Sequence, residues 1–118
     1  LVTEVDARGA LLSDLWSGAE LLVHHLDEAQ ALALEHAEGP LDARVVGASE
    51  RELLVLPGAL HHPADALDPA RRVLDAARER GMTTTEVLDA LLRMERVLRA
   101  SSRVRAGFAY RAEALARA

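Results

Sequence analysis

The sequence contains no cysteine, no lysine, few aromatic residues and no long apolar run. Without cysteine, disulfides and thiolate metal sites are excluded. No apolar run approaches the roughly 18 residues that a membrane-spanning helix needs, and no basic-then-apolar leader points to secretion, so we expect a cytoplasmic protein. The only aromatic residues are Trp16, Phe108 and Tyr110, which predicts a core of leucine, valine and alanine.

The length of 118 residues suits one domain, and we predict a single domain over residues 1–118. The charge is unevenly spread along it. Residues 1–70 hold 3 arginines and 13 carboxylates, a formal charge of −10, whereas residues 71–118 hold 11 arginines and 6 carboxylates, a formal charge of +5. Such asymmetry fits a nucleic-acid surface. It equally fits two halves that attract each other, within a chain or across a dimer, and we favour this because it requires no further partner.

The clearest pattern lies in residues 82–118. Three threonines at 83–85 are candidate N-caps, and Glu86 follows in the first turn, where a carboxylate complements the helix dipole. Apolar residues then recur at helical spacing, with a break near Ser101 or Gly107 and a second helix that ends the chain. This stripe is either core or a seam facing a second subunit. For the seam we predict a homodimer buried through Val87, Leu91, Met94, Leu98, Phe108 and Leu115.

A second helix precedes this one, from Asp68 as N-cap and Pro69 as first residue to Arg80, where Gly81 closes it. Residues 70–95 then match the spacing of a helix-turn-helix, so a DNA-binding transcriptional regulator is an alternative function. The residues that would contact DNA are Arg71, Arg72, Thr83, Thr84, Thr85 and Arg93. Carboxylates on the same helix would repel phosphates, and an ordinary αα-corner explains the pattern equally well.

The N-terminal third fits two readings. The apolar residues between 12 and 26 follow helical spacing, so we predict helix for most of residues 10–37, ended by Gly39-Pro40. The alternative is a hairpin, with strands at 1–6 and 10–16 around a turn at 7–9. Further along, the branched apolar runs 44–46 and 53–56 flank a polar turn at 47–52 and predict a β-hairpin.

These elements together predict a mainly α fold of the α+β class, with four to five helices and one short β-hairpin around residues 44–56. If residues 1–16 form the alternative hairpin, the order of strand, strand, helix 19–37, strand and strand resembles that of the Roadblock family. This resemblance covers about half of the chain and rests on no specific motif. It implies a small homodimeric scaffold that regulates GTPases, with helices in place of the fifth strand that the family has before its last helix.

Histidine is the one residue type that suggests a metal, because imidazole is a common ligand. Glu20 and His24 would share a helical face, so a histidine-based metal-binding helical bundle is a further alternative. The histidines are His24, His25, His36, His61 and His62. Their spacing matches no HExxH or paired ExxH motif.

The arginine-rich C-terminal end contains Phe108 and Tyr110, and basic residues beside aromatics can bind RNA or single strands. Its arginines are Arg93, Arg96, Arg99, Arg103, Arg105 and Arg111. No phosphate loop, nucleophile elbow or cofactor motif is present, so we predict no enzyme and no cofactor. We therefore predict a non-catalytic regulatory or protein-interaction module that is homodimeric and binds another protein.

Overall fold

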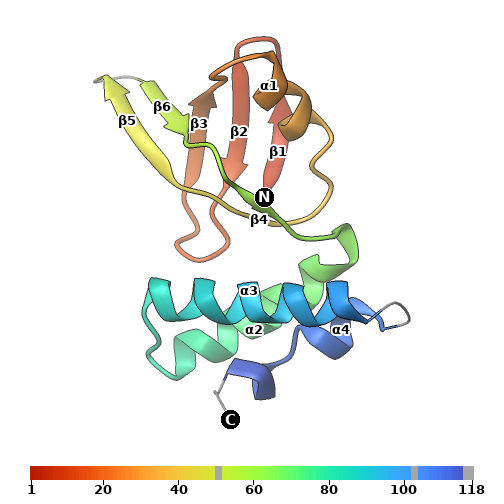
Figure 1. The fold of residues 1–118 in the computed structure, drawn as a ribbon. Helices are drawn as coiled ribbons and strands as arrows, with labels where there is room; N and C mark the ends of the chain where they lie inside the picture. The colour runs from red at the N-terminus through yellow and green to blue at the C-terminus, as the bar shows by residue number, and fades with distance from the viewer. Residues whose placement is uncertain (50–51, 102–103, 116–118) are drawn as a thin grey trace. The chain divides into compact units, whose positions relative to one another are not determined.

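The computed structural model describes residues 1–49, 52–101 and 104–115, and the chain divides into two compact units. Leu1–His61 form a β-sheet with one α-helix, here named the sheet unit. His62–Ala118 contain the remaining helices and are named the helical unit (Figure 1). That the whole chain folds as one domain stays a prediction.

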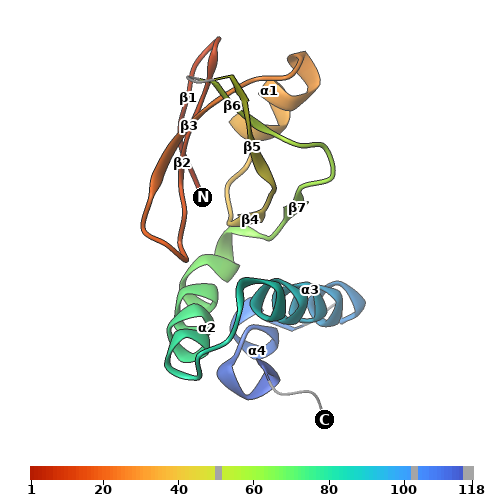
Figure 2. The ribbon, with the colours of Figure 1, turned by 90° about the vertical axis from the view of Figure 1, so that its left-hand side faces the viewer.

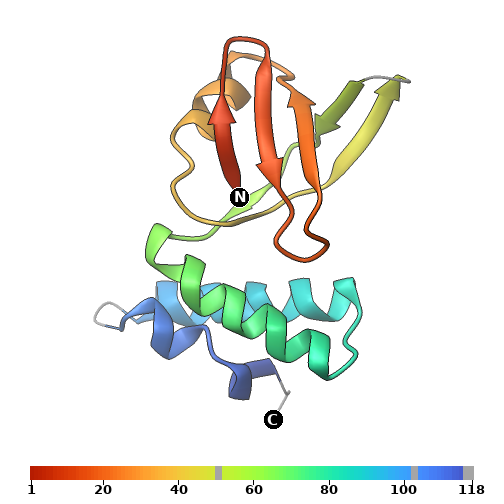
Figure 3. The same ribbon diagram turned by 180° about the vertical axis from the view of Figure 1, so that it is seen from behind.

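Five strands make the main sheet, in the order β1-β2-β3-β6-β5 (Figure 3). Their bounds are β1 Val2–Val5, β2 Gly9–Ser13, β3 Glu20–His24, β5 Val45–Ser49 and β6 Glu52–Val55. The β3–β6 pair is parallel and the other neighbours are antiparallel, so the sheet is mixed. A second, two-stranded antiparallel sheet joins β4 Leu41–Asp42 to β7 Leu60–His61.

The turn between β1 and β2 is fixed locally by Asp6. Its carboxylate accepts hydrogen bonds from the backbone N–H groups of Arg8 and Gly9, at 2.8 and 2.9 Å. Both bonds lower the pKa of the Asp6 carboxyl group, and the bond from Gly9 has the larger effect. Gly9 is required by space, because a Cβ atom there would lie 2.0 Å from the carbonyl oxygen of Val23 on β3.

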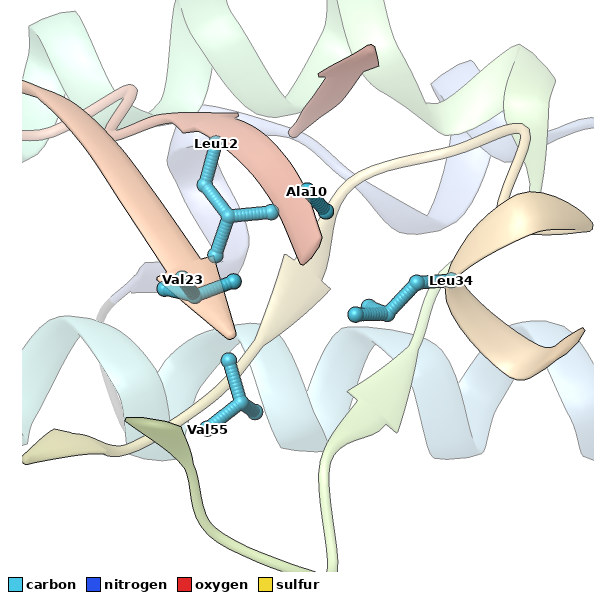
Figure 4. Packing of buried hydrophobic residues seen from close by; sticks show 5 residues of the cluster. All are labelled: Ala10, Leu12, Val23, Leu34 and Val55. Carbon is cyan, nitrogen blue, oxygen red and sulfur yellow. The ribbon is translucent and has the colours of Figure 1, made fainter. Parts of the chain in front are cut away.

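Helix α1, Glu28–Glu35, covers one face of the sheet. Asp27 caps its N-terminus by accepting the N–H of Gln30 at 2.8 Å. The Gln30 amide donates to the carbonyl oxygen of Val55 at 2.8 Å, which ties the helix to β6. The core of this unit lies between helix and sheet and is wholly apolar (Figure 4). It consists of Ala10, Leu12, Val23, Leu34 and Val55.

The predicted mainly α fold with a single hairpin is therefore wrong, since the structure is an α+β fold with a five-stranded sheet. The helix predicted for most of residues 10–37 is β2, β3 and a short α1, and the alternative hairpin at 1–16 is the arrangement found. The Roadblock-like order is also altered, because β3 takes the first part of the helix expected at 19–37. The hairpin around 44–56 is confirmed as β5 and β6, although residues 50 and 51 of its turn lie outside the described ones.

The helical unit contains two main helices, α2 Leu67–Glu79 and α3 Thr84–Ala100, and shorter turns around them. Gly81 between them has a φ of 66°, which only glycine adopts readily, and so ends α2 cleanly. Thr83, one of the three predicted N-cap candidates, caps α3, and it does so in a reciprocal capping box with Glu86. The shorter elements are η1 Ala64–Ala66, α4 Ala106–Ala109 and η2 Ala112–Leu115.

Both predicted helices of this unit are confirmed, and α3 ends next to Ser101, where a break was expected. Two details differ. Helix α2 begins at Leu67, so Asp68 lies in its first turn and not at the cap. The second C-terminal helix is two short pieces, α4 and η2, because the sequence after Ala100 lacks a continuous apolar stripe.

Candidate interaction surface

Figure 3 views the sheet from the side opposite α1, here named the outer face. Exposed apolar side chains lie on this face. Side chains two residues apart on a strand share a face, so Leu22 points away from the buried Val23. Leu22 is 63% exposed and pairs in register with Leu11 on β2. Val46 is 38% exposed and pairs with Leu54 on β6. Four apolar side chains therefore lie on a face that α1 leaves open.

Three exposed carboxylates also lie on the outer face and are here named the acidic rim. Glu4 pairs in register with Leu11, and Glu20 and Glu52 each precede an outer-face leucine by two residues. In the part of the chain that the structure describes, none of the three forms an ion pair. The outer face therefore carries four apolar side chains and three carboxylates, together with His24, which pairs in register with Leu54.

The two edge strands of the sheet differ. Edge strands expose unpaired backbone groups, and proteins protect them with charges and bulges. Strand β1 has both, a bulge between Val2 and Glu4 and the charge of Glu4 itself. Strand β5 has a bulge between Gly47 and Ser49 but no charged residue among its five. The β1 edge is therefore better protected than the β5 edge against pairing with a strand of another chain.

The predicted dimer stripe lies mostly inside the helical unit. Val87, Leu91 and Met94 are buried on α3, and Leu115 is buried on η2. Leu98 is half-buried, and only Phe108 is well exposed. Side chains this buried have little surface left for a partner, so the packing matches the alternative in which the stripe is core. A dimer through these residues stays a prediction.

Some of the residues predicted to contact DNA have exposed side chains, and others form contacts within the helical unit. Arg71, Arg72, Thr84 and Thr85 are exposed. Thr83 is exposed too, but its hydroxyl accepts the backbone N–H of Glu86 at 3.2 Å in the capping box. Arg93 is half-buried, forms an ion pair with Asp89 and also donates to the carbonyl oxygen of Leu115 at 3.4 Å. These residues thus surround the N-terminus of α3 without forming one basic patch, and DNA binding stays a prediction.

Helices α3 and α4 are in contact (Figure 2), and each has exposed apolar and basic side chains. Val97 is 50% and Phe108 59% exposed, and the Arg111 guanidinium lies 5.0 Å from the centre of the Phe108 ring. Together with the exposed Arg96 and Arg105, these residues are here named the arginine corner. Among the described residues none of its three arginines forms an ion pair. Arg103, predicted to belong to this region, lies outside the described residues.

Two polar pairs are buried in the helical unit. His62 and Tyr110 are almost fully buried, and the His62 Nδ1 and the Tyr110 hydroxyl form a short hydrogen bond. Glu95 is also buried and accepts a bond from the Arg99 Nε at 2.8 Å, while the Arg99 side chain remains exposed. Both pairs join groups within the unit, so we assign them to its packing and not to a site.

The histidines do not converge. Glu20 and His24 lie on a strand and not on a helix, so four residues separate them by about 13 Å. In residues 1–49, 52–101 and 104–115 no group of three or more histidines and carboxylates is placed to hold a metal ion. The helical bundle that the metal-binding alternative requires is also missing from residues 1–61, which form the sheet unit.

The sequence interpretation missed the outer face because residues 20–24 were assigned to a helix. The signal was present: Leu21, Leu22 and Val23 in succession are typical of a strand that is apolar on both faces.

Within the described residues, no helix has the length and apolar character to cross a membrane. No family model, curated protein or solved structure matches the chain.

Proposed function

We propose that the chain is a non-catalytic regulatory or protein-interaction module that works as a homodimer. The observation that carries this proposal is the group of exposed apolar side chains on the outer face. Antiparallel and mixed sheets commonly leave one face to solvent, but that face is then usually polar. Here it presents Leu22 and Val46, with Leu11 and Leu54 beside them. Contiguous exposed apolar surface with a polar rim is typical of an interaction site.

The chemistry of this surface supports binding more than bond making. Burying one exposed leucine stabilises a complex by about 1.5–3 kcal/mol, and four neighbouring apolar side chains would supply a useful part of a dimer interface. The acidic rim would select the orientation and the partner.

The test is the association state of the whole chain and of a Leu22→Ser variant. We expect sedimentation equilibrium between about 1 µM and 1 mM to show a dimer of the 12.7 kDa chain, which Leu22→Ser weakens by roughly tenfold or more. Leu32→Ser is the matched control, because Leu32 is 55% exposed but lies on α1, away from the outer face. A chain that stays monomeric throughout this range contradicts the proposal.

A second candidate function is a helix-turn-helix DNA-binding regulator, which α2, Gly81 and the capped start of α3 support by their spacing. Its test is retardation of a duplex DNA at increasing salt, with an Arg71→Ala/Arg72→Ala variant. Phosphate contacts predict binding that weakens steeply with salt, and weakens further in the variant. Retardation that the variant leaves unchanged would exclude these arginines.

A further inference from the structure

We propose that the outer face of the sheet docks onto the arginine corner of a second copy, and that the second copy returns the same contact. This inference rests on the proposed function and goes beyond it, because it names the two surfaces that meet. Homodimerisation alone would leave open whether the outer face meets its own equivalent, an edge strand or the helical unit of the partner.

Charge excludes the simplest arrangement, in which two outer faces meet. The sheet unit holds 3 arginines and 11 carboxylates, a formal charge of −8. Two outer faces in contact would bring Glu4, Glu20 and Glu52 of both copies into one interface. Like charges directly opposed in an interface are strongly unfavourable. The occupant of the outer face therefore has to carry positive charge.

The chain itself supplies such an occupant. The helical unit holds 11 arginines and 8 carboxylates, a formal charge of +3. Its arginine corner combines Val97 and Phe108, both at least half exposed, with the guanidinium groups of Arg96, Arg105 and Arg111. The outer face carries four apolar side chains and three carboxylates, and the corner carries two exposed apolar side chains and three arginines. The two surfaces thus match in both charge and hydrophobicity.

The proposal is a closed assembly. A contact between two different surfaces ends at two copies when a two-fold axis relates it to the same contact in return, and we propose this arrangement and not an open chain of copies. Each copy then uses both of its exposed surfaces once, and the assembly stops at two copies. Arginine is well suited to the contact because its planar guanidinium pairs with carboxylates in two parallel hydrogen bonds.

The experiment is a charge exchange in the whole chain, measured by sedimentation equilibrium. The rim variant carries Glu20→Arg and Glu52→Arg, and the corner variant carries Arg96→Glu and Arg105→Glu. We expect each variant alone to dimerise at least about tenfold more weakly than the wild type, because each opposes like charges in both contacts. Their equimolar mixture should restore the dimer, since the arginines of one variant then face the glutamates of the other in both contacts.

The matched control is Glu35→Arg with Glu38→Arg, which makes the same charge change on the sheet unit without touching the outer face. It should dimerise like the wild type, and circular dichroism should show all variants folded. The inference is overturned if the corner variant dimerises normally, as contact between outer faces or β5 edges would allow, or if the mixture stays monomeric. A wild-type monomer that retards a single-stranded RNA through Arg96 and Arg105 overturns the inference and the proposed homodimer together. A wild-type dimer that neither variant weakens overturns the inference alone.

Discussion

The two units of this chain differ in how their structure is encoded. In the helical unit each main helix is bounded by residues next to it in sequence, Gly81 after α2 and the Thr83–Glu86 capping box before α3. In the sheet unit the decisive contacts are distant, since β3 pairs with β2 on one side and with β6, about 30 residues later, on the other. Local signals therefore predict the helical unit well and the sheet unit poorly.

The comparison is sharpest at residues 20–24. A strand buried on one face alternates apolar and polar residues, and that alternation is the usual sign of a strand. Leu22 breaks it by being apolar on the outer face, so the segment matched the spacing of a helix. The feature that misled the secondary-structure prediction is the same one that makes the outer face a candidate interaction surface.

The largest effect should come from the core of the helical unit. Met94 is 1% exposed, and Met94→Ala should cost about 2–5 kcal/mol, because it leaves a cavity among packed side chains. Far-UV circular dichroism reports mainly the helices, and the fluorescence of Trp16 reports the sheet unit. In urea unfolding we expect the dichroism transition to move to lower urea while the Trp16 transition moves much less. Equal shifts of both would show that the two units unfold as one cooperative domain.

In the sheet unit, the largest effect of adding one methyl group should be at Gly9. Gly9→Ala places a Cβ atom 2.0 Å from a backbone oxygen of β3, so β2 and β3 must move apart, at a cost of about 1–3 kcal/mol. Gly47→Ala on β5 is the control, because among the described residues a Cβ atom there would meet nothing within 4 Å beyond its chain neighbours. It should change stability by about 0.5 kcal/mol or less. Equal free energies of unfolding for the two variants in urea would contradict the tight β2–β3 approach.

A smaller effect should follow from the polar pair in the helical core. Tyr110→Phe removes the hydroxyl that hydrogen-bonds His62. It should lower the free energy of unfolding by about 1–2 kcal/mol, because the buried imidazole loses a hydrogen-bond partner. Phe108→Leu, at an exposed position two residues away, should change the free energy of unfolding of the monomer by less than about 0.5 kcal/mol, measured at a concentration below that at which the dimer forms. A loss at Phe108 as large as at Tyr110 would refute this assignment.

The smallest effect should be the pH dependence of the α3 cap. Hydrogen bonds from Thr83 lower the pKa of Glu86 in the folded chain; the bond from the backbone N–H has the larger effect and the bond from the hydroxyl the smaller one. A lowered pKa means that the stabilisation is present above the unfolded pKa of about 4.3 and is lost as the pH falls through the folded value. The melting temperature of the wild type should therefore exceed that of Glu86→Gln at pH 7, and the difference should shrink towards about pH 3. A difference that does not change with pH would exclude a charged capping box.

Local chemistry was enough to predict the two main helices of the helical unit, but little of the sheet unit or of the candidate surface. The turn at Gly81, the cap at Thr83 and the end of α3 near Ser101 depend on residues within one turn of each other, and all three are confirmed. The apolar stripe of α3 predicted burial but not what covers it. The outer face could not be predicted from local patterns, because it exists only once β2, β3, β6 and β5 lie side by side.

The amino-acid order by itself determined where α2 ends and where α3 begins and ends, because backbone N–H and C=O groups at these helix ends are satisfied by near neighbours. Only the tertiary structure decided that residues 20–24 are a strand, since their backbone groups are satisfied by β2 and β6, far away in the chain. That pairing places Leu22 and Val46 together on an open face that also carries carboxylates. No local pattern specifies such a surface, because its members share a face only after the sheet has formed.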